Sequence, residues 1–106
     1  MAEATHEATA SGVWLALATD AGDRVSGEVW CQVTAPDGTW ATQVARATVE
    51  DPDVFALQYP DDFFGLPEGE DRDQWMKPGT RPVRWFAEMN QGEVARPLAE
   101  DAFDLG

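Results

Sequence analysis

The sequence predicts an all-β domain, either a small antiparallel β-sandwich or a small β-barrel. Three observations lead to this prediction. One segment alternates between apolar and polar residues, several short apolar runs end at turn-forming residues, and two pairs of runs are joined by turns typical of hairpins. We expect six or seven strands and one long loop rich in acidic and aromatic residues. At 106 residues the chain has the size of a single domain with one core.

The clearest strand signal lies at residues 25–35. Val29, Cys31 and Val33 fall on one face of this segment, and Trp30 falls on the other face. A period of two residues indicates a strand with one buried face and one face mostly exposed to water. Cys31 is therefore expected in the core, as a free thiol that packs like a small apolar side chain and resists thiol reagents.

The other strands are inferred from short apolar runs bounded by turns. Pro36, Asp37 and Gly38 suit a tight turn, so we expect a hairpin between residues 25–35 and 40–49. Further strands are expected at 13–19, 54–59, 83–88 and 94–98, with a turn at 90–92, and Phe103 and Leu105 are expected to dock the C-terminal tail.

Residues 1–12 are expected to form an extended N-terminal arm, and residues 13–106 the single β domain. The arm contains Ala, Thr, Glu and Ser with almost no large apolar side chains. Such a segment buries too little apolar surface to offset the entropy lost on ordering. We therefore expect it to become ordered only against a neighbouring chain.

The late part of the sequence resembles the late strands of bacterial immunoglobulin-like modules. The resemblance is carried by residues 59–63 (Tyr-Pro-Asp-Asp-Phe) and by residues 78–85, where a Pro-Gly turn leads into an alternating strand that contains Trp85. It covers under a third of the chain. Two features depart from the pattern: Cys31 has no partner cysteine, and Pro82 stands where the tyrosine corner has an aromatic residue. The resemblance implies an immunoglobulin-like sandwich used for adhesion or assembly, without catalysis.

The charge of the chain argues against several classes of partner. The sequence contains 20 Asp and Glu against 7 Lys and Arg, which gives a formal net charge of −13. Such a charge repels phosphate backbones and anionic membrane surfaces, so we expect neither direct nucleic-acid binding nor membrane binding. The N-terminal residues show no secretion signal, and with the free cysteine this favours synthesis in the cytoplasm. Part of the charge is also consistent with adaptation to a salt-rich medium.

The chain has few residues with the chemistry of a catalytic site. His6 lies in the expected arm, Cys31 in a strand and Lys77 in the long loop, so no histidine-based nucleophilic site is expected. One cysteine and one histidine do not make a structural zinc site. The sequence therefore favours a protein that is not an enzyme and has no cofactor.

Calcium is the metal that the composition allows, because it takes six to eight oxygen ligands and loops of a sandwich can gather acids. No twelve-residue calcium-loop pattern is present, and a solvated acidic rim explains the same residues. The candidate ligands are Asp51, Asp53, Asp61, Asp62, Glu70, Asp71 and Asp73.

Residues 60–82 form the predicted long loop, with one helical turn at most, at residues 70–76. Loops longer than about 15 residues are uncommon in compact domains and are often functional. Aromatic residues supply contact area at an interface, and acids steer a basic partner. The expected anchors are Phe63, Phe64 and Trp75, and the expected steering groups are Asp61, Asp62 and Asp73. The alternative is that these rings fold back as a lid on one end of the sandwich.

Trp30 is a further candidate for partner binding, because it lies on the polar face of its strand. Five tryptophans in one small domain also suggest a second apolar surface, which would be an interface. We therefore expect a noncatalytic assembly module that binds a protein partner or its own copies. Its narrowest form is a repeated subunit of a phage particle or a similar protein shell, which would place the chain in a virion. One alternative is an acidic nucleic-acid mimic that inhibits a DNA- or RNA-binding enzyme. A calcium-dependent binding domain is the second alternative.

Overall fold

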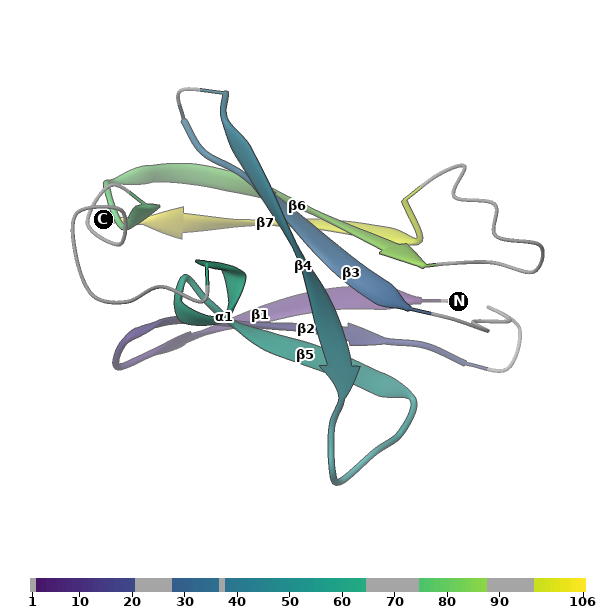
Figure 1. Cartoon of the computed structure of the whole chain (residues 1–106). Coiled ribbons are helices and arrows are strands. Elements are labelled where there is room, and N and C mark those ends of the chain that lie inside the picture. The colour runs from purple at the N-terminus through teal and green to yellow at the C-terminus, as the bar shows by residue number, and fades with distance from the viewer. Residues whose placement is uncertain (1, 21–27, 37, 65–74, 88–96) are drawn as a thin grey trace.

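The computed structural model describes residues 2–20, 28–36, 38–64, 75–87 and 97–106. In these residues it contains seven antiparallel strands and one short helix (Figure 1). The strands are β1 (Glu3–Thr9), β2 (Gly12–Ala18), β3 (Val29–Thr34), β4 (Trp40–Ala47), β5 (Val54–Tyr59), β6 (Gly79–Ala87) and β7 (Ala99–Leu105), and the helix is α1 (Asp61–Phe64). The all-β prediction is confirmed.

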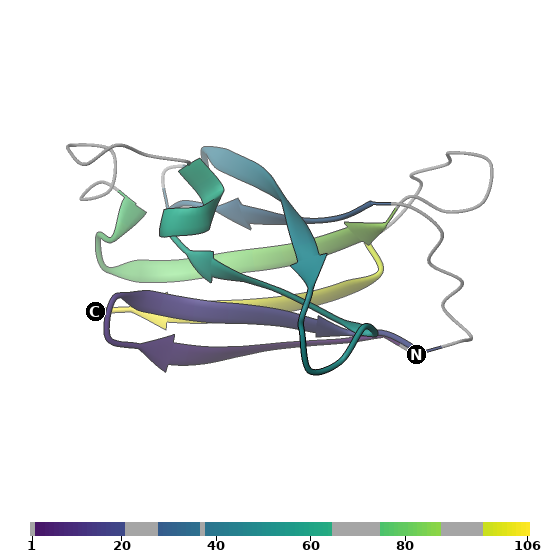
Figure 2. The same ribbon diagram turned by 60° about the horizontal axis from the view of Figure 1, so that its bottom comes forward.

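The strands form one sheet in the order β1-β2-β5-β4-β3-β6-β7, which nearly closes into a barrel. In Figures 1 and 2 the sheet folds into two layers, with β1, β2 and β5 in one and β3, β6 and β7 in the other. Strand β4 crosses between them. It pairs with β3 over six residue pairs but with β5 only at Arg46↔Ala56 and Ala47↔Phe55. The fold is thus an incompletely closed, flattened barrel whose two layers are joined by β4.

In an immunoglobulin constant-type sandwich the fourth strand pairs with the fifth strand, in the sheet that also contains the first and second strands. Here β4 pairs mainly with β3, so the division into two sheets differs from that pattern. The core contacts differ, because Cys31 of the third strand lies opposite Trp85 of the sixth. In antibody domains the buried tryptophan belongs to the third strand and packs on a disulfide.

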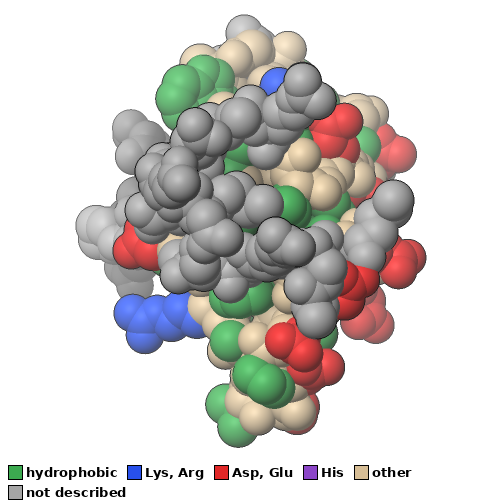
Figure 3. All heavy atoms as spheres, turned by 90° about the vertical axis from the view of Figure 1, so that its right-hand side faces the viewer, with side chains coloured by type: hydrophobic (Ala, Val, Ile, Leu, Met, Phe, Trp, Pro, Cys, Tyr) green, Lys and Arg blue, Asp and Glu red, His purple; other side chains and the backbone are tan. Residues whose placement is uncertain are grey.

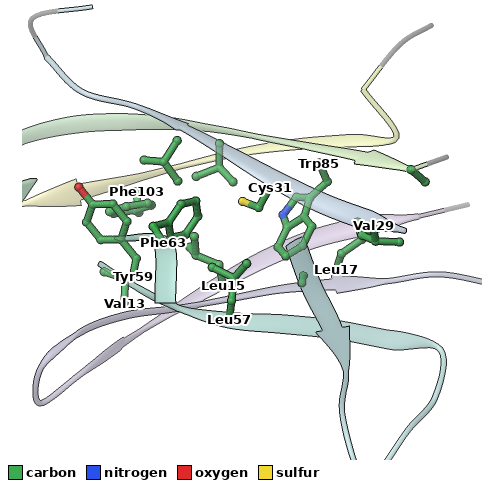
Figure 4. Close-up of a cluster of buried hydrophobic side chains, with 14 residues drawn as sticks. Val13, Leu15, Leu17, Val29, Cys31, Leu57, Tyr59, Phe63, Trp85 and Phe103 are labelled. Carbon is green, nitrogen blue, oxygen red and sulfur yellow. The ribbon is translucent and has the colours of Figure 1, made fainter. Parts of the chain in front are cut away.

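The core fills the space between the layers with alternate residues of the strands. Strand β3 contributes Val29, Cys31 and Val33, all buried, as its alternation predicted. Figure 4 shows Cys31 between Phe63 of α1 and Trp85 of β6. The remaining buried hydrophobic side chains are Val13, Leu15, Leu17, Ala45, Leu57, Tyr59, Val83, Ala87 and Phe103.

Several expected elements are confirmed. Strand β5 begins and ends where it was predicted, and β2 and β4 lie within two residues of their predicted limits. The hairpin turn is closed by hydrogen bonds from the Gly38 N–H to the Ala35 carbonyl and from the Ala35 N–H to the Thr39 carbonyl. Gly38 has a φ of 92°, which explains a glycine at this position. Asp37 and the expected turn at 90–92 lie outside the described residues.

The expected N-terminal arm is corrected. Residues 3–9 form β1, which pairs with β2 from Glu3↔Ala18 to Thr9↔Gly12, so the domain begins well before residue 13. The composition of residues 3–9 did not indicate a strand, because an edge strand is held largely by backbone hydrogen bonds and needs few apolar side chains. Most β1 side chains are indeed exposed. Strand β2 therefore orders this segment without a neighbouring chain.

Three further differences from the expected elements concern the second half of the chain. Strand β6 begins at Gly79 and not at Val83, so Pro82 lies inside a strand, and α1 was not predicted. Of the strand expected at 94–98, residues 94–96 lie outside the described residues, and residues 97 and 98 are not in a strand. The last strand of the described part is β7, at residues 99–105. Its acidic residues hid an alternation in which Phe103 is buried while Glu100 and Asp104 are exposed.

Candidate functional site

Of the expected anchors in the long loop, Phe63 and Trp75 have described side chains, and Phe63 does not lie on the surface. The Phe63 ring is 4% exposed and packs edge-on against Tyr59, with the ring centroids 5.7 Å apart. Phe63 is therefore part of the core, as in the alternative in which the rings of this loop fold back as a lid. The prediction that Phe63 anchors a partner is wrong. The helix α1 follows β5 directly and reverses the chain, which places the Phe63 ring over the end of the barrel.

The other loop residues have different environments. Trp75 is half-buried and packs against the core. Asp61 and Asp62 are exposed in α1, and Asp62 Oδ2 accepts a hydrogen bond of 2.6 Å from the Gln58 backbone N–H. Asp73 and the side chain of Phe64 lie outside the described residues. Partner binding by this loop stays a prediction, and Phe63 no longer supports it.

The indole of Trp30 is half-buried on the outward side of β3, as predicted. Its strand neighbours are Val44 of β4 and Phe86 of β6, which lie directly opposite it in the register. The Phe86 ring stacks with the indole, with centroids 6.0 Å apart and planes 20° apart. Val44 is 44% exposed, and Trp40 further along β4 is 61% exposed. We call the outward side of β4, β3 and β6, centred on Val44, Trp30 and Phe86, the Trp30 face.

Two hollows adjoin on the Trp30 face and share Gln43 and Val44 as lining residues. The first, of about 420 Å³, lies on the β4 side of the indole and is lined also by Glu28, Trp30 and Thr42. The second, of about 230 Å³, lies where β4 and β5 separate, and is lined also by Arg46, Ala56, Leu57 and Asp62.

Side chains replace strand pairing at the second hollow. In the orientation that satisfies its amide, Gln43 donates hydrogen bonds to the backbone carbonyls of Asp62 and Phe63, at 3.2 and 3.1 Å. The Asp62 carboxylate meets the Gln58 N–H on the other side of the gap. These hydrogen bonds connect α1 to β4 and β5 at the opening between the two strands.

Arg81 is a buried cation whose hydrogen bonds stabilise the fold. Its guanidinium is fully buried and donates to the backbone carbonyls of Gly79, Trp75 and Lys77, at 3.0, 3.0 and 2.6 Å. The Tyr59 hydroxyl donates to the same Trp75 carbonyl. Burial raises the pKa of Tyr59, and the hydrogen bond and charge of Arg81 oppose that rise. These contacts fix residues 75–79 against the core.

The residues with catalytic chemistry lie in two different places. Burial raises the pKa of the Cys31 thiol well above its ordinary value of 9.0, so the thiol stays protonated and unreactive at neutral pH. His6 is not in a free arm: its Nδ1 lies 2.7 Å from Asp101 Oδ2, and its ring lies 6.2 Å from that of Phe103. This pair joins β1 to β7 at the seam where the barrel nearly closes. It was not predictable, because 95 positions separate the two residues.

The calcium candidates divide between two described segments. Asp51 and Asp53 share a turn in which the Asp53 N–H donates to Asp51 Oδ1. Asp61 and Asp62 lie in α1, and Glu70, Asp71 and Asp73 fall outside the described residues. Within the described part of the chain, no three His, Cys, Asp or Glu side chains come together as a metal site would require. Calcium binding stays a prediction.

Sequence reasoning identified Trp30 and missed the residues around it. The missing signal was available, because 40–46 and 80–86 alternate, which places Val44 and Phe86 on outward faces. The strand order that makes them neighbours of Trp30 is a tertiary property.

The search for similar proteins found no match to a protein-family model, a curated protein or a solved structure. No helix among the described residues is long and apolar enough to span a membrane. The fold and the site thus define a small all-β domain with an outward aromatic face.

Proposed function

We propose that this protein is a noncatalytic binding module of a larger protein assembly, and that the Trp30 face is its contact surface. The observation that carries the proposal is the outward row of Val44, Trp30 and Phe86, beside which lie two hollows. Interfaces are enriched in aromatic residues at their centre, and tryptophan is among the residues that contribute most to binding.

The position of Trp30 supports this proposal over a purely structural role. An aromatic pair across two strands stabilises a sheet whether or not it binds a partner. That role does not require the exposed Val44 and Trp40 on the same side, or a hollow against the indole. A partner would cover these groups and remove them from water.

The narrower proposal, a repeated subunit of a phage particle or similar shell, has lost one of its supports. The ordered N-terminus no longer calls for a neighbouring chain, because β2 orders it. The surplus of aromatic residues still supports an interface, but an interface with any protein partner would account for it. We therefore propose a protein-binding module in general, with a shell subunit as its most specific form.

The test compares two outward-facing tryptophans on opposite layers, the half-buried Trp30 and the exposed Trp14. Purified domain, Trp30→Ala and Trp14→Ala are immobilised and exposed to an extract of source cells. The bound proteins are then identified by mass spectrometry. Trp14 is 39% exposed on β2 and serves as the matched control. We expect one set of proteins to bind the parent and Trp14→Ala, and to be lost with Trp30→Ala.

Circular dichroism melts establish that both variants are folded before the comparison. Equal retention by all three proteins would contradict the proposal, and so would a loss confined to Trp14→Ala. Capture that depends on salt alone and is indifferent to either tryptophan would favour the acidic nucleic-acid mimic.

A further inference from the structure

The larger hollow on the Trp30 face combines two groups that favour a cation. Its lining includes the Trp30 indole and the Glu28 side chain, which is exposed. Phe86 of β6 stacks with the indole, and the hollow lies beside the indole toward β4, because its other lining residues include Thr42, Gln43 and Val44. A planar guanidinium stacks favourably on an indole and pairs with a carboxylate.

The neighbouring hollow has a different character. Its apolar residues include Leu57 and Ala56 of β5, and the cation Arg46 and the carboxylate Asp62 also line it. Because Arg46 offsets the attraction of Asp62, whose Oδ2 already accepts the Gln58 N–H, a second positive charge gains little there, whereas an aliphatic side chain would bury apolar surface. Because the two hollows adjoin at Val44, a ligand that fills both carries a cation beside an aliphatic group.

The charge of the whole protein selects the same kind of ligand. The net charge of −13 opposes association of two copies through this face, and attracts a basic segment of another protein. Figure 3 shows acidic side chains along one rim of the molecule, at the end that lies on the right of Figure 1, with few basic ones among the coloured atoms. The field of the domain therefore favours a cationic partner before contact is made.

We propose that the Trp30 face binds an extended segment of a basic partner protein, with an arginine side chain against Trp30 and Glu28 and an adjacent aliphatic side chain in the hollow between β4 and β5. This inference rests on the proposed function and names the chemistry of the partner. The arginine supplies the cation–π contact and the ion pair, and the aliphatic group supplies buried apolar area.

The experiment uses four short synthetic peptides that differ at one central position, flanked by valines. The central residue is arginine, lysine, citrulline or glutamate, and binding is followed by tryptophan fluorescence and by NMR shifts of the labelled domain. Citrulline has nearly the shape of arginine without its charge. We expect the arginine peptide to bind most tightly, about fivefold to tenfold more tightly than the citrulline peptide. The glutamate peptide should bind most weakly.

Two variants locate the binding. Glu28→Gln removes a charge from an exposed side chain, and it should reduce the preference for arginine over citrulline by about threefold or more. Val44→Arg places a cation beside the hollow and should weaken the arginine peptide most. The matched control is Glu50→Gln in the turn between β4 and β5, which removes the same charge away from both hollows and should leave the preference unchanged.

Several outcomes would overturn this inference. Equal binding of the arginine and citrulline peptides would do so, and so would no binding of any peptide at millimolar concentration. A preference that survives Glu28→Gln unchanged would remove the proposed site. A dimer that forms with rising concentration and is broken by Trp30→Ala would show that a second copy occupies the face. If the extract proteins still depend on Trp30 while the peptides show no charge preference, the proposed function stands and this inference fails.

Discussion

The two faces of strand β6 use the same residue types for opposite purposes. On the inner face, Arg81 and Trp85 are both 0% exposed. On the outer face, Arg84 is 56% exposed and pairs with Glu100 at 3.3 Å, and Phe86 stacks on Trp30. Burial, rather than residue type, therefore decides whether an arginine or an aromatic ring stabilises the fold or remains available to a partner.

The largest expected effect is on the inner face, at Trp85. Its side chain is among the largest fully buried ones and lies opposite Cys31 between the layers. Trp85→Ala should reduce the free energy of unfolding by about 3–5 kcal/mol, because it leaves a large cavity in the core. Urea unfolding followed by circular dichroism measures the loss. A change below about 1 kcal/mol would mean that this ring is not part of the core.

Arg81 is expected to follow closely. Arg81→Met preserves much of the side-chain volume and removes the donors to the carbonyls of Trp75, Lys77 and Gly79. The free energy of unfolding should fall by about 3 kcal/mol, because buried carbonyls left without donors are costly. Hydrogen exchange of residues 75–79 should rise in step. An unchanged midpoint of urea unfolding would show that water replaces the guanidinium at no cost.

Alkaline pH provides a third way to weaken the inner face. The Cys31 thiol and the Tyr59 hydroxyl have ordinary pKa values of 9.0 and 10.0, and burial raises both in the folded protein. The unfolded chain therefore loses these protons first. The resulting stability is fully present below pH 9 and is lost as the pH rises toward the folded-state pKa values. When the pKa of a group differs by one between the folded and unfolded protein, the free energy of unfolding changes by about 1.4 kcal/mol.

Urea unfolding as a function of pH tests this expectation. Stability of the parent should fall with pH above about 9, and Cys31→Ala together with Tyr59→Phe should flatten the curve in that range. We expect the double variant to be less stable at neutral pH because it removes buried side-chain atoms, so the slope rather than the absolute value is compared. An equal slope in both proteins would place the titrating groups elsewhere.

The smallest effects on stability are expected on the outer face. Phe86→Ala should cost about 1 kcal/mol or less, since its ring is partly exposed, and Arg84→Ala about 0.5 kcal/mol or less, since surface ion pairs contribute little. Binding should respond in the opposite proportion. Phe86→Ala is expected to weaken capture of the partner by about tenfold, because the indole loses its stacked support. If it instead destabilises the fold as strongly as Trp85→Ala, the Trp30 face is a second core.

Local sequence determined the strands with clear alternation or sharp turns. Val29, Cys31 and Val33 had to lie on one side of β3 and Trp30 on the other, because a strand alternates its side chains. The glycine at position 38, with φ of 92°, likewise fixed the turn before β4. These features depend on neighbours a few positions apart, and a sequence displays such neighbours directly.

The tertiary structure decided which segments meet. Residues 3–9 became a strand because β2 offered an unpaired edge, although their own composition favours disorder. Phe63 entered the core because α1 turns it back over the barrel, and His6 met Asp101 across the seam. The Trp30 face likewise exists because β3 lies between β4 and β6. Such contacts join residues far apart in the chain. Periodicity shows which face of a strand a side chain occupies, but the backbone groups that pair strands are the same in nearly every residue, so the pattern of one strand does not identify its neighbour.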